Sequence, residues 1–189
     1  AMNSWRVRAS TSFEHRHGAE LEASMAAGQA DIAVGPAPSD WDGPVHELGV
    51  EEFVVVLPPD DPLADGAKDV ELPLLADRGW VHYSPENGLA EVLDQACAGA
   101  GFQARAAVRT EQTAAAPMLA AAGLGPALVP ANIIPKQFGG ALLRPDPPVQ
   151  RTLTAYTRSS PDPLTAAFVD TLARKAAVFP DHVRRRIVG

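Results

Sequence analysis

The chain contains 189 residues, and its apolar content of 46% is enough to fill the core of one compact domain or of two small lobes. Its 23 acidic and 16 basic residues leave a net charge of −7, which argues against direct contact with nucleic acid. No apolar stretch approaches the length of a membrane span and no secretory signal is recognised, so we expect a cytoplasmic protein without membrane contact.

Residues that could hold a metal or a cofactor are sparse. The single cysteine, Cys97, falls between alanines on a predicted helix and is interpreted as a small buried hydrophobe. His15 and His17 would share one side of a strand, but two ligands alone seldom hold zinc. We therefore expect no metal site and no cofactor.

The first predicted elements alternate between strand and helix. Residues 5–9 alternate in the manner of a strand, residues 19–27 have the apolar spacing of a helix that ends at Gly28, and residues 31–35 form a short buried strand. The loop that follows, residues 36–44, is rich in turn-forming residues. This alternation is typical of an α/β fold.

An unbroken apolar run, residues 53–57, comes next and stops at Pro58 and Pro59. The run is too short for an amphipathic helix, its valines suit a strand buried on both faces, and proline can neither continue a helix nor donate to a strand ladder. We interpret the run as a strand that leaves one lobe for another. Clefts between lobes commonly bind small ligands, so the function expected here is ligand binding.

Strands and helices continue to alternate in the second half of the chain. The predicted strands are residues 80–83, 104–108, 126–129 and 152–156, and the predicted helices follow Asn87, Pro117, Pro130 and Pro163. On the last helix, Phe168, Val169 and Leu172 are expected to share one side, and the arginines at 184–186 are interpreted as a solvated tail.

The turn at residues 84–88 joins a predicted strand to a predicted helix. Ser84 or Asn87 can cap the helix by accepting a hydrogen bond from a backbone N–H. The free N–H groups and the positive end of the helix dipole also make the turn a candidate anion site, although such turns commonly cap only their own helix.

Four segments in order resemble one known pattern: residues 28–34, residues 53–63, residues 121–130, and the closing strand and helix with Phe168. Over residues 19–177 the chain resembles the effector-binding domain of LysR-type transcriptional regulators. The resemblance implies an α/β fold of the type-2 periplasmic-binding-protein kind, N-terminally shortened, with two Rossmann-like lobes joined by two crossover strands. The implied crossovers are residues 53–57 and 149–152, and the implied lobes are residues 1–57 with 149–189 (lobe I) and residues 58–148 (lobe II).

In that family a small-molecule effector contacts loops at strand ends in both lobes. The matching positions carry polar or backbone donors and are His17, Gly18, Gly35, Ser84, Asn87, Thr110, Gln112 and Pro130. Residues 5–11 match either of two family strands, and Ser10 and Thr11 join the site only under the first of these registers. An organic acid and a neutral metabolite both stay open as the effector.

The chain also departs from the family pattern. The winged helix-turn-helix of the family is not recognised, so we expect no direct nucleic acid contact by this chain. The long helix of the usual dimer face is also missing, which leaves a homodimer as one open assembly. Ala1 and Met2 resemble a tag remnant before a native start, and a whole gene product and a fragment both stay open.

Three functions fit this scaffold. A sensor works by closure, since an effector that contacts both lobes stabilises the closed state. An enzyme needs an acid or a base, for which His82, Glu86 and Glu111 are candidates without a supporting motif. A solute-binding protein of a transporter needs an export signal. We favour the first, which is not an enzyme.

Overall fold

The computed structural model describes residues 18–176 and 178–188. The strand expected at residues 5–9 and the candidates Ser10, Thr11 and His17 lie outside the described residues. The predictions for these positions therefore stay predictions.

The described elements alternate along the chain, as the sequence pattern predicts. The helices are α1 (Gly18–Ala26), α2 (Gly88–Gly99), α3 (Ala116–Ala121), α4 (Pro163–Lys175) and α5 (Asp181–Ile187). The strands are β1 (Ile32–Pro36), β2 (Val45–Leu57), β3 (Asp69–Glu71), β4 (Gly79–Tyr83), β5 (Arg105–Thr110), β6 (Ala127–Pro130), β7 (Ala141–Asp146) and β8 (Gln150–Thr157). Short 3-10 turns are η1 (Pro62–Ala64), η2 (Leu72–Leu75), η3 (Thr113–Ala115) and η4 (Ala131–Ile133).

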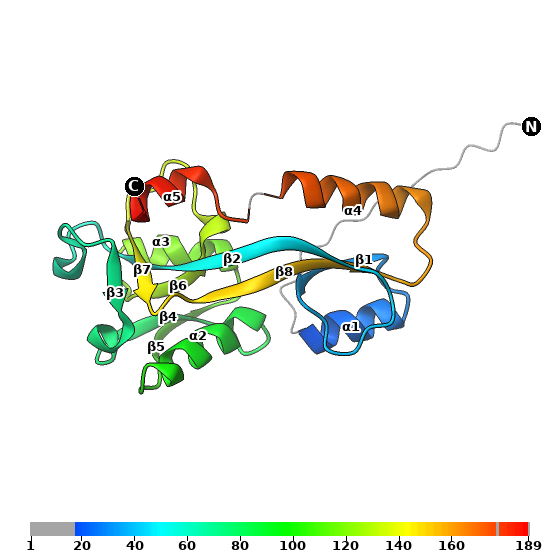
Figure 1. The fold of residues 1–189 in the computed structure, drawn as a ribbon. Coiled ribbons are helices and arrows are strands. Elements are labelled where there is room, and N and C mark those ends of the chain that lie inside the picture. Colours follow the sequence, from blue (N-terminus) through cyan, green and yellow to red (C-terminus); the bar gives the residue numbers. More distant parts are fainter. Residues whose placement is uncertain (1–17, 177, 189) are drawn as a thin grey trace, which may run out of the picture.

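Two long strands, β2 and β8, run side by side along the molecule (Figure 1). The first part of β2 pairs antiparallel with β8, from Val45 opposite Tyr156 to Glu52 opposite Gln150. The last part of β2 pairs instead with β6 and β7. The apolar run at residues 53–57 is therefore the end of a longer strand that passes from one packed region into another, and the predicted α/β fold class is confirmed.

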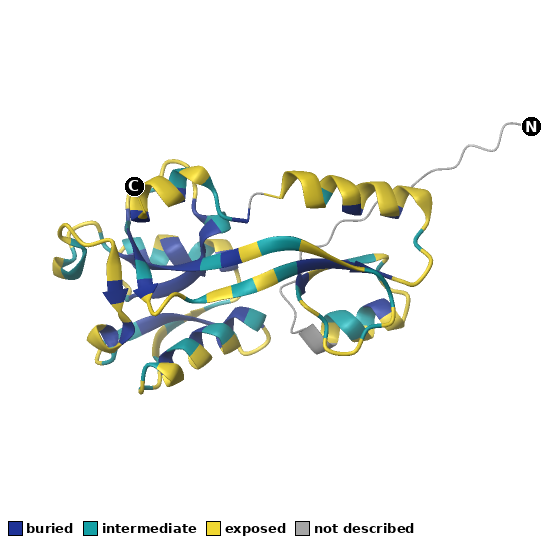
Figure 2. Cartoon of the chain, in the orientation of Figure 1, coloured by how far each residue is buried: buried dark blue, intermediate teal, exposed yellow. Residues whose placement is uncertain are grey.

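The residues that end β2 form the centre of the larger core. Phe53 and the residues up to Leu57 are at most 1% exposed, because β6 and β7 flank them and helices cover the sheet. Figure 2 shows this burial where β2 enters the larger region, and it shows buried and exposed residues mixed where β2 pairs with β8. A smaller core forms around Met25, Ala33 and Tyr156. The lobe boundaries at 57/58 and 148/149 stay a prediction.

The region around the smaller core is a thin sheet with one helix on each face. Strand order there is β1, β8, β2, and Figure 1 shows α1 and α4 on opposite sides of these strands. Trp41 packs edge-on against Tyr156, with ring centroids 5.5 Å apart, and its indole N–H donates to the carbonyl oxygen of Thr157. The aromatic pair therefore fixes the 37–44 loop against β8.

In the larger region, strand ends meet at one edge. Strands β4 and β5 are parallel, with Tyr83 opposite Thr110. Val81 N–H donates to the carbonyl oxygen of Pro126, and the Tyr83 hydroxyl donates to the carbonyl oxygen of Leu128. Residue numbers rise together along β4 and β6 in these two contacts, so the two strands run in the same direction. The carboxyl ends of β4, β5 and β6 therefore lie at the edge where β2 enters this region, and open α/β sheets commonly bind ligands at such an edge.

Two local predictions are corrected by the structure. The helix expected to run from Pro130 is a single turn, η4, after which Ile134 is extended. Pro135 follows Ile134, and a residue before proline is disfavoured in the α conformation. On α4, Val169 is buried but Phe168 is 50% exposed, so the two do not share a side. Neighbouring helix residues lie about 100° apart around the axis, which accounts for the difference.

The expected solvated tail is instead a packed helix, α5. Val183 and Ile187, four residues apart, are buried in the larger core. His182 contacts the carbonyl oxygen of Ile134, and Arg186 donates to the carbonyl oxygens of Phe138 and Gly140. The run of arginines concealed the apolar spacing, and the arginine heads stay at the surface while the helix packs.

Candidate functional site

A cavity of about 580 Å³ opens between the loops that follow β4 and β5. The residues that line it are Ser84, Glu86, Asn87, Glu111, Gln112, Thr113 and Ala114. Three predicted site residues, Ser84, Asn87 and Gln112, are therefore brought together, and Thr110 is next to the second loop. Because β4 and β5 are parallel neighbours, both loops leave the sheet at the same edge.

Asn87 holds this cavity together. Its Oδ1 accepts from the Leu89 N–H at 3.0 Å and so caps α2. Its Nδ2 donates to the carbonyl oxygen of Glu111 at 3.2 Å and to the Thr113 hydroxyl at 3.3 Å. The side chain is 3% exposed, so its amide ties the two loops to each other and has little surface left for a ligand.

Thr110 and Ser84 differ in how free their hydroxyls are. The Thr110 Oγ1 accepts from the Gln112 N–H at 3.2 Å, and the Ser84 N–H donates to the carbonyl oxygen of Thr110 at 3.0 Å. Within the described part of the chain, the Ser84 hydroxyl has no hydrogen-bond partner. Ser84 is therefore the lining residue whose hydroxyl is most available to a bound molecule.

The charges around the cavity are mixed. The first turn of α2 directs backbone N–H groups and the positive end of its dipole towards the residue 84–88 turn. Two carboxylates, Glu86 and Glu111, line the same cavity, and no lysine or arginine is among its lining residues. The cavity therefore combines backbone donors with acidic side chains.

The other predicted residues lie elsewhere. Gly35, on β1, accepts a hydrogen bond from the Thr154 hydroxyl, and a Cβ there would meet Leu21 Cδ1 at 2.9 Å, so glycine lets α1 pack on β1. Gly18 begins α1. Pro130 ends β6, opposite Phe53, and is buried. None of these residues lines the cavity.

A charged cluster lies where the two long strands enter the larger region, and the sequence analysis did not find it. Glu51 of β2 is opposite Arg151 of β8. The Arg151 Nε donates to Glu51 Oε2 at 2.5 Å, and the Asn132 Nδ2 donates to Glu51 Oε1 at 2.9 Å. The Arg151 guanidinium also lies over the Phe53 ring, 5.4 Å from its centroid. Both oxygens of this buried carboxylate are therefore satisfied.

The charges of this cluster act on Tyr83, the last residue of β4. Burial raises the pKa of the Tyr83 phenol, the positive charge of Arg151 opposes the rise, and the negative charge of Glu51 adds to it. Ser84 follows Tyr83 directly in the chain. Glu51 and Arg151 therefore act on the side chain of the residue that precedes Ser84.

Of the three candidates for acid-base catalysis, Glu86 and Glu111 line the cavity and His82 does not. The ring of His82 is engaged at both nitrogens: Nε2 lies 3.1 Å from Asp94 Oδ1, and Nδ1 lies 2.9 Å from the carbonyl oxygen of Tyr83 and 3.1 Å from Arg109 Nη1. His82 is 3% exposed and does not line the cavity.

Within residues 18–176 and 178–188, no three His, Cys, Asp or Glu side chains are grouped so that they could hold a metal ion.

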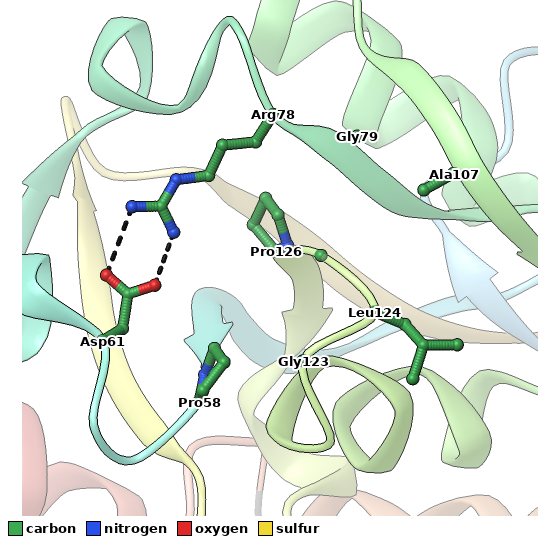
Figure 3. Close-up of a pocket in the computed structure, with 9 residues that line it drawn as sticks. Pro58, Asp61, Arg78, Gly79, Ala107, Gly123, Leu124 and Pro126 are labelled. Carbon is green, nitrogen blue, oxygen red and sulfur yellow. Dashed lines mark hydrogen bonds and ion pairs between the residues drawn. The ribbon is translucent and has the colours of Figure 1, made fainter.

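A second cavity, of about 400 Å³, lies at the opposite end of β4. Figure 3 shows the Arg78 guanidinium facing the Asp61 carboxylate on one side, with Ala107 and Leu124 on the other. Arg78 donates to Asp61 at 2.5 and 3.2 Å. Since the two charged groups satisfy each other, the rest of the lining is apolar side chain and glycine or proline backbone, and no predicted site residue belongs to it.

The ion pair at this second cavity leads to a stability prediction. The hydrogen bond from Arg78 holds the pKa of Asp61 below its ordinary value, burial opposes this, and the Leu63 N–H supports it. A depressed pKa stabilises the fold above the unfolded pKa, about 3.9, and this contribution is lost as the pH falls through the folded pKa. We expect Asp61→Asn to lower the free energy of unfolding by about 1–2 kcal/mol at pH 7.

Urea unfolding at several pH values measures this effect. The difference between Asp61→Asn and the unaltered chain should begin to shrink as the pH falls below about 3.9, and it should be lost below the depressed pKa of Asp61, where that side chain is neutral like Asn. Asp60→Asn, at an exposed neighbouring carboxylate, is the control and should change the free energy of unfolding by less than about 0.5 kcal/mol. An equal loss from the two substitutions would contradict the assignment.

No helix in the described part of the chain combines the length and the apolar character needed to cross a lipid bilayer. The helices and strands described above all belong to the α/β unit, with none left over for a separate DNA-binding module among these residues.

Solved structures with a similar fold come from bacterial regulators. The C-terminal domain of a probable LysR family transcriptional regulator from Rhodococcus sp. RHA1 is 22% identical with a TM-score of 0.68, over 87% of this chain and 84% of that one. An OxyR mutant from Corynebacterium glutamicum is 25% identical with a TM-score of 0.67, over 90% of this chain and 54% of that one. The CcmR regulatory domain of Synechocystis PCC6803, in complex with 2-PG, is 16% identical with a TM-score of 0.74, over 85% and 79%.

Comparison with curated protein sequences gives no match. The family model described as "LysR substrate binding domain" matches residues 8–177, which confirms the resemblance that the sequence motifs indicate. Because this match spans most of the chain, the protein belongs to the LysR substrate binding domain family.

Proposed function

We propose that this domain binds a small-molecule effector in the cavity between the loops after β4 and β5, and that it works as the sensing part of a LysR-type regulator. The observation that carries the proposal is the free Ser84 hydroxyl in a cavity at the carboxyl edge of β4 and β5. Two regulator domains of similar fold were solved with small molecules bound, CcmR with 2-PG and QuiR with shikimate. These likenesses support the proposal.

In the proposed mechanism the effector acts by closure. Lobe I (residues 1–57 and 149–189) and lobe II (residues 58–148) move about the paired strands β2 and β8, with α5 packed on the larger core. An effector that contacts both lobes binds the closed form more tightly than the open form, and this difference in affinity shifts the population towards closure. Gly18 and Gly35 in lobe I, with Pro130 in lobe II, complete the proposed contact set.

The proposal includes no catalysis. Binding alone shifts the equilibrium, and the buried His82 is already held by Asp94 and Arg109. The proposed setting is the cytoplasm, with DNA contact made by another part of a regulator. Incubation of the protein with each bound compound should return that compound unchanged, as measured by mass spectrometry.

A ligand screen tests the proposal. Small aromatic acids, aliphatic acids, sugars and neutral metabolites are added to the purified protein, and its thermal unfolding is measured with each compound. A ligand present at 100 times its Kd should raise the free energy of unfolding by about 2.7 kcal/mol. Ser84→Ala should raise the Kd of that ligand about 3- to 10-fold, because one neutral hydrogen bond is lost.

Two variants make this result specific. Ser84→Trp fills the cavity and should abolish the shift, while Ser159→Ala removes an exposed hydroxyl outside the cavity and should leave it unchanged. A screen without any shift, or a ligand that stabilises the Ser84 variants as much as the unaltered protein, would refute binding at this cavity.

A further inference from the structure

The guanidinium of Arg151 is held in one position and still has donors to offer. Its Nε is bonded to Glu51, whose side chain is 4% exposed, while the side chain of Arg151 is 25% exposed. Within the described residues, its Nη1 and Nη2 groups have no hydrogen-bond partner. An arginine oriented by a buried carboxylate presents a planar pair of N–H donors, the geometry that matches a carboxylate ligand.

Arg151 lies at the same edge of the sheet as the cavity. Asn132, which shares Glu51 with it, follows the carboxyl end of β6, and Phe53, which stacks with it, is opposite Pro130. The charge of Arg151 also acts on Tyr83, the residue before Ser84. Arg151 therefore joins the two long strands to the carboxyl ends of β4 and β6.

Two other arginines in the larger region already use terminal nitrogens in hydrogen bonds. Arg109 donates through Nη1 to the carbonyl oxygen of Tyr83 and lies within 3.1 Å of His82 Nδ1. Arg78 pairs with Asp61 at the other cavity, beyond the opposite end of β4. Arg109 therefore has one terminal nitrogen bonded and Arg78 has both, whereas neither terminal nitrogen of Arg151 is bonded within the described residues.

The acidic lining restricts what the effector can carry at its other end. Glu86 and Glu111 line the cavity, and like charges disfavour a second carboxylate there. A hydroxyl or amino group at the other end of the effector can donate hydrogen bonds to Glu86 and Glu111, because ionised carboxylates only accept.

We propose that Arg151 anchors the carboxylate of a monocarboxylate effector and that Glu51 positions Arg151 for this contact. This inference rests on the proposed function, since it needs an effector that binds beside Ser84 and extends beyond the lining of the cavity to Arg151. Dicarboxylates bind more weakly at this site than monocarboxylates of similar size.

Arginine side-chain resonances test the proposal directly. The whole chain is labelled with ¹⁵N,¹³C-arginine and titrated with acetate, propionate and benzoate, with acetamide, propionamide and benzamide as neutral matches, and with succinate as the dicarboxylate. Arg151→Lys assigns the Arg151 signal. We expect a saturable shift of that signal with the monocarboxylates, none with the amides, and a weaker one with succinate.

Arg144 supplies a matched control. Its Nε bonds Asp69 at 2.9 Å, as the Arg151 Nε bonds Glu51, but Arg144 lies on β7 with a side chain 39% exposed, outside the cavity. Its signal should follow only the linear effect of ionic strength. For the tightest monocarboxylate, Arg151→Gln should weaken binding about 10- to 100-fold, whereas Arg144→Gln should leave the Kd unchanged.

The outcomes separate this inference from the proposed function. An Arg151 signal that ignores all three monocarboxylates, or that responds equally to the amides, overturns the anchor. A neutral compound that binds at Ser84 with equal affinity in Arg151→Gln also overturns it and leaves the proposed function standing. If Arg151→Gln does not fold, the titration of the unaltered chain decides the question.

Discussion

Gly125→Ala is expected to lower the free energy of unfolding by about 3–5 kcal/mol. Gly125 has a φ of +128°, a conformation that side chains disfavour. A Cβ at this position would lie 1.9 Å from the carbonyl oxygen of Gly79, which begins β4. The substitution must therefore push β4 away from the loop that leads into β6.

Two other glycines separate the contributions to this loss. Gly123 has a φ of +89° but open space around its Cβ position, so Gly123→Ala should lose only the conformational part, about 1–2 kcal/mol. Gly139 has open space and no positive φ, and Gly139→Ala should change stability by less than about 0.5 kcal/mol. Guanidinium unfolding measures all three. A Gly125→Ala loss no larger than that of Gly123→Ala would show that the contact with Gly79 does not restrain the fold.

Glu51→Ala is expected to lower the free energy of unfolding by about 3 kcal/mol, as the loss of one partner of a buried ion pair does. The substitution leaves the Arg151 guanidinium without its buried counter-charge and Asn132 without its acceptor. Glu51→Gln keeps a hydrogen-bond acceptor at this position and should lose less, about 1–2 kcal/mol. Denaturant unfolding measures both variants.

The neighbouring Glu52 provides the control for this experiment. Glu52 is adjacent on β2 and is less deeply buried, and its side chain has no hydrogen bond or ion pair within the described residues. Glu52→Ala should therefore change stability by less than about 0.5 kcal/mol. If Glu51→Ala proves as stable as Glu52→Ala, the cluster does not stabilise the junction of the two long strands.

The length of β2 shows where a local pattern stops being informative. Residues 53–57 were predicted as a strand because the run is short, apolar and rich in valine and stops at two prolines, and the structure buries all five side chains. The earlier part, from Val45, was not predicted, since its residues are mostly exposed or half-buried and include charged side chains. That part becomes a strand through its pairing with β8, a partner about 100 residues away in the chain.

The site shows the same division. Ser84, Asn87 and Gln112 were expected in one site because the resemblance to the LysR effector-binding domain matches them to loops that contact the effector. In the structure they lie together because β4 and β5 are parallel neighbours that end at the same edge. The capping of α2 by Asn87 was predicted as one of two alternatives and is confirmed. Its bonds to Glu111 and Thr113 could not be predicted, because these acceptors belong to the neighbouring loop.

Fold class, family and the strand-end loops of the cavity were all readable from local patterns: apolar runs, proline and glycine stops, and four motifs in order. The meeting of Glu51, Asn132 and Arg151 had no local signal, and neither did the packing of α5 on the larger core. These contacts depend on the register of β2 against β8 and β6, and a register is set by the packing of distant segments and not by the residues beside each group.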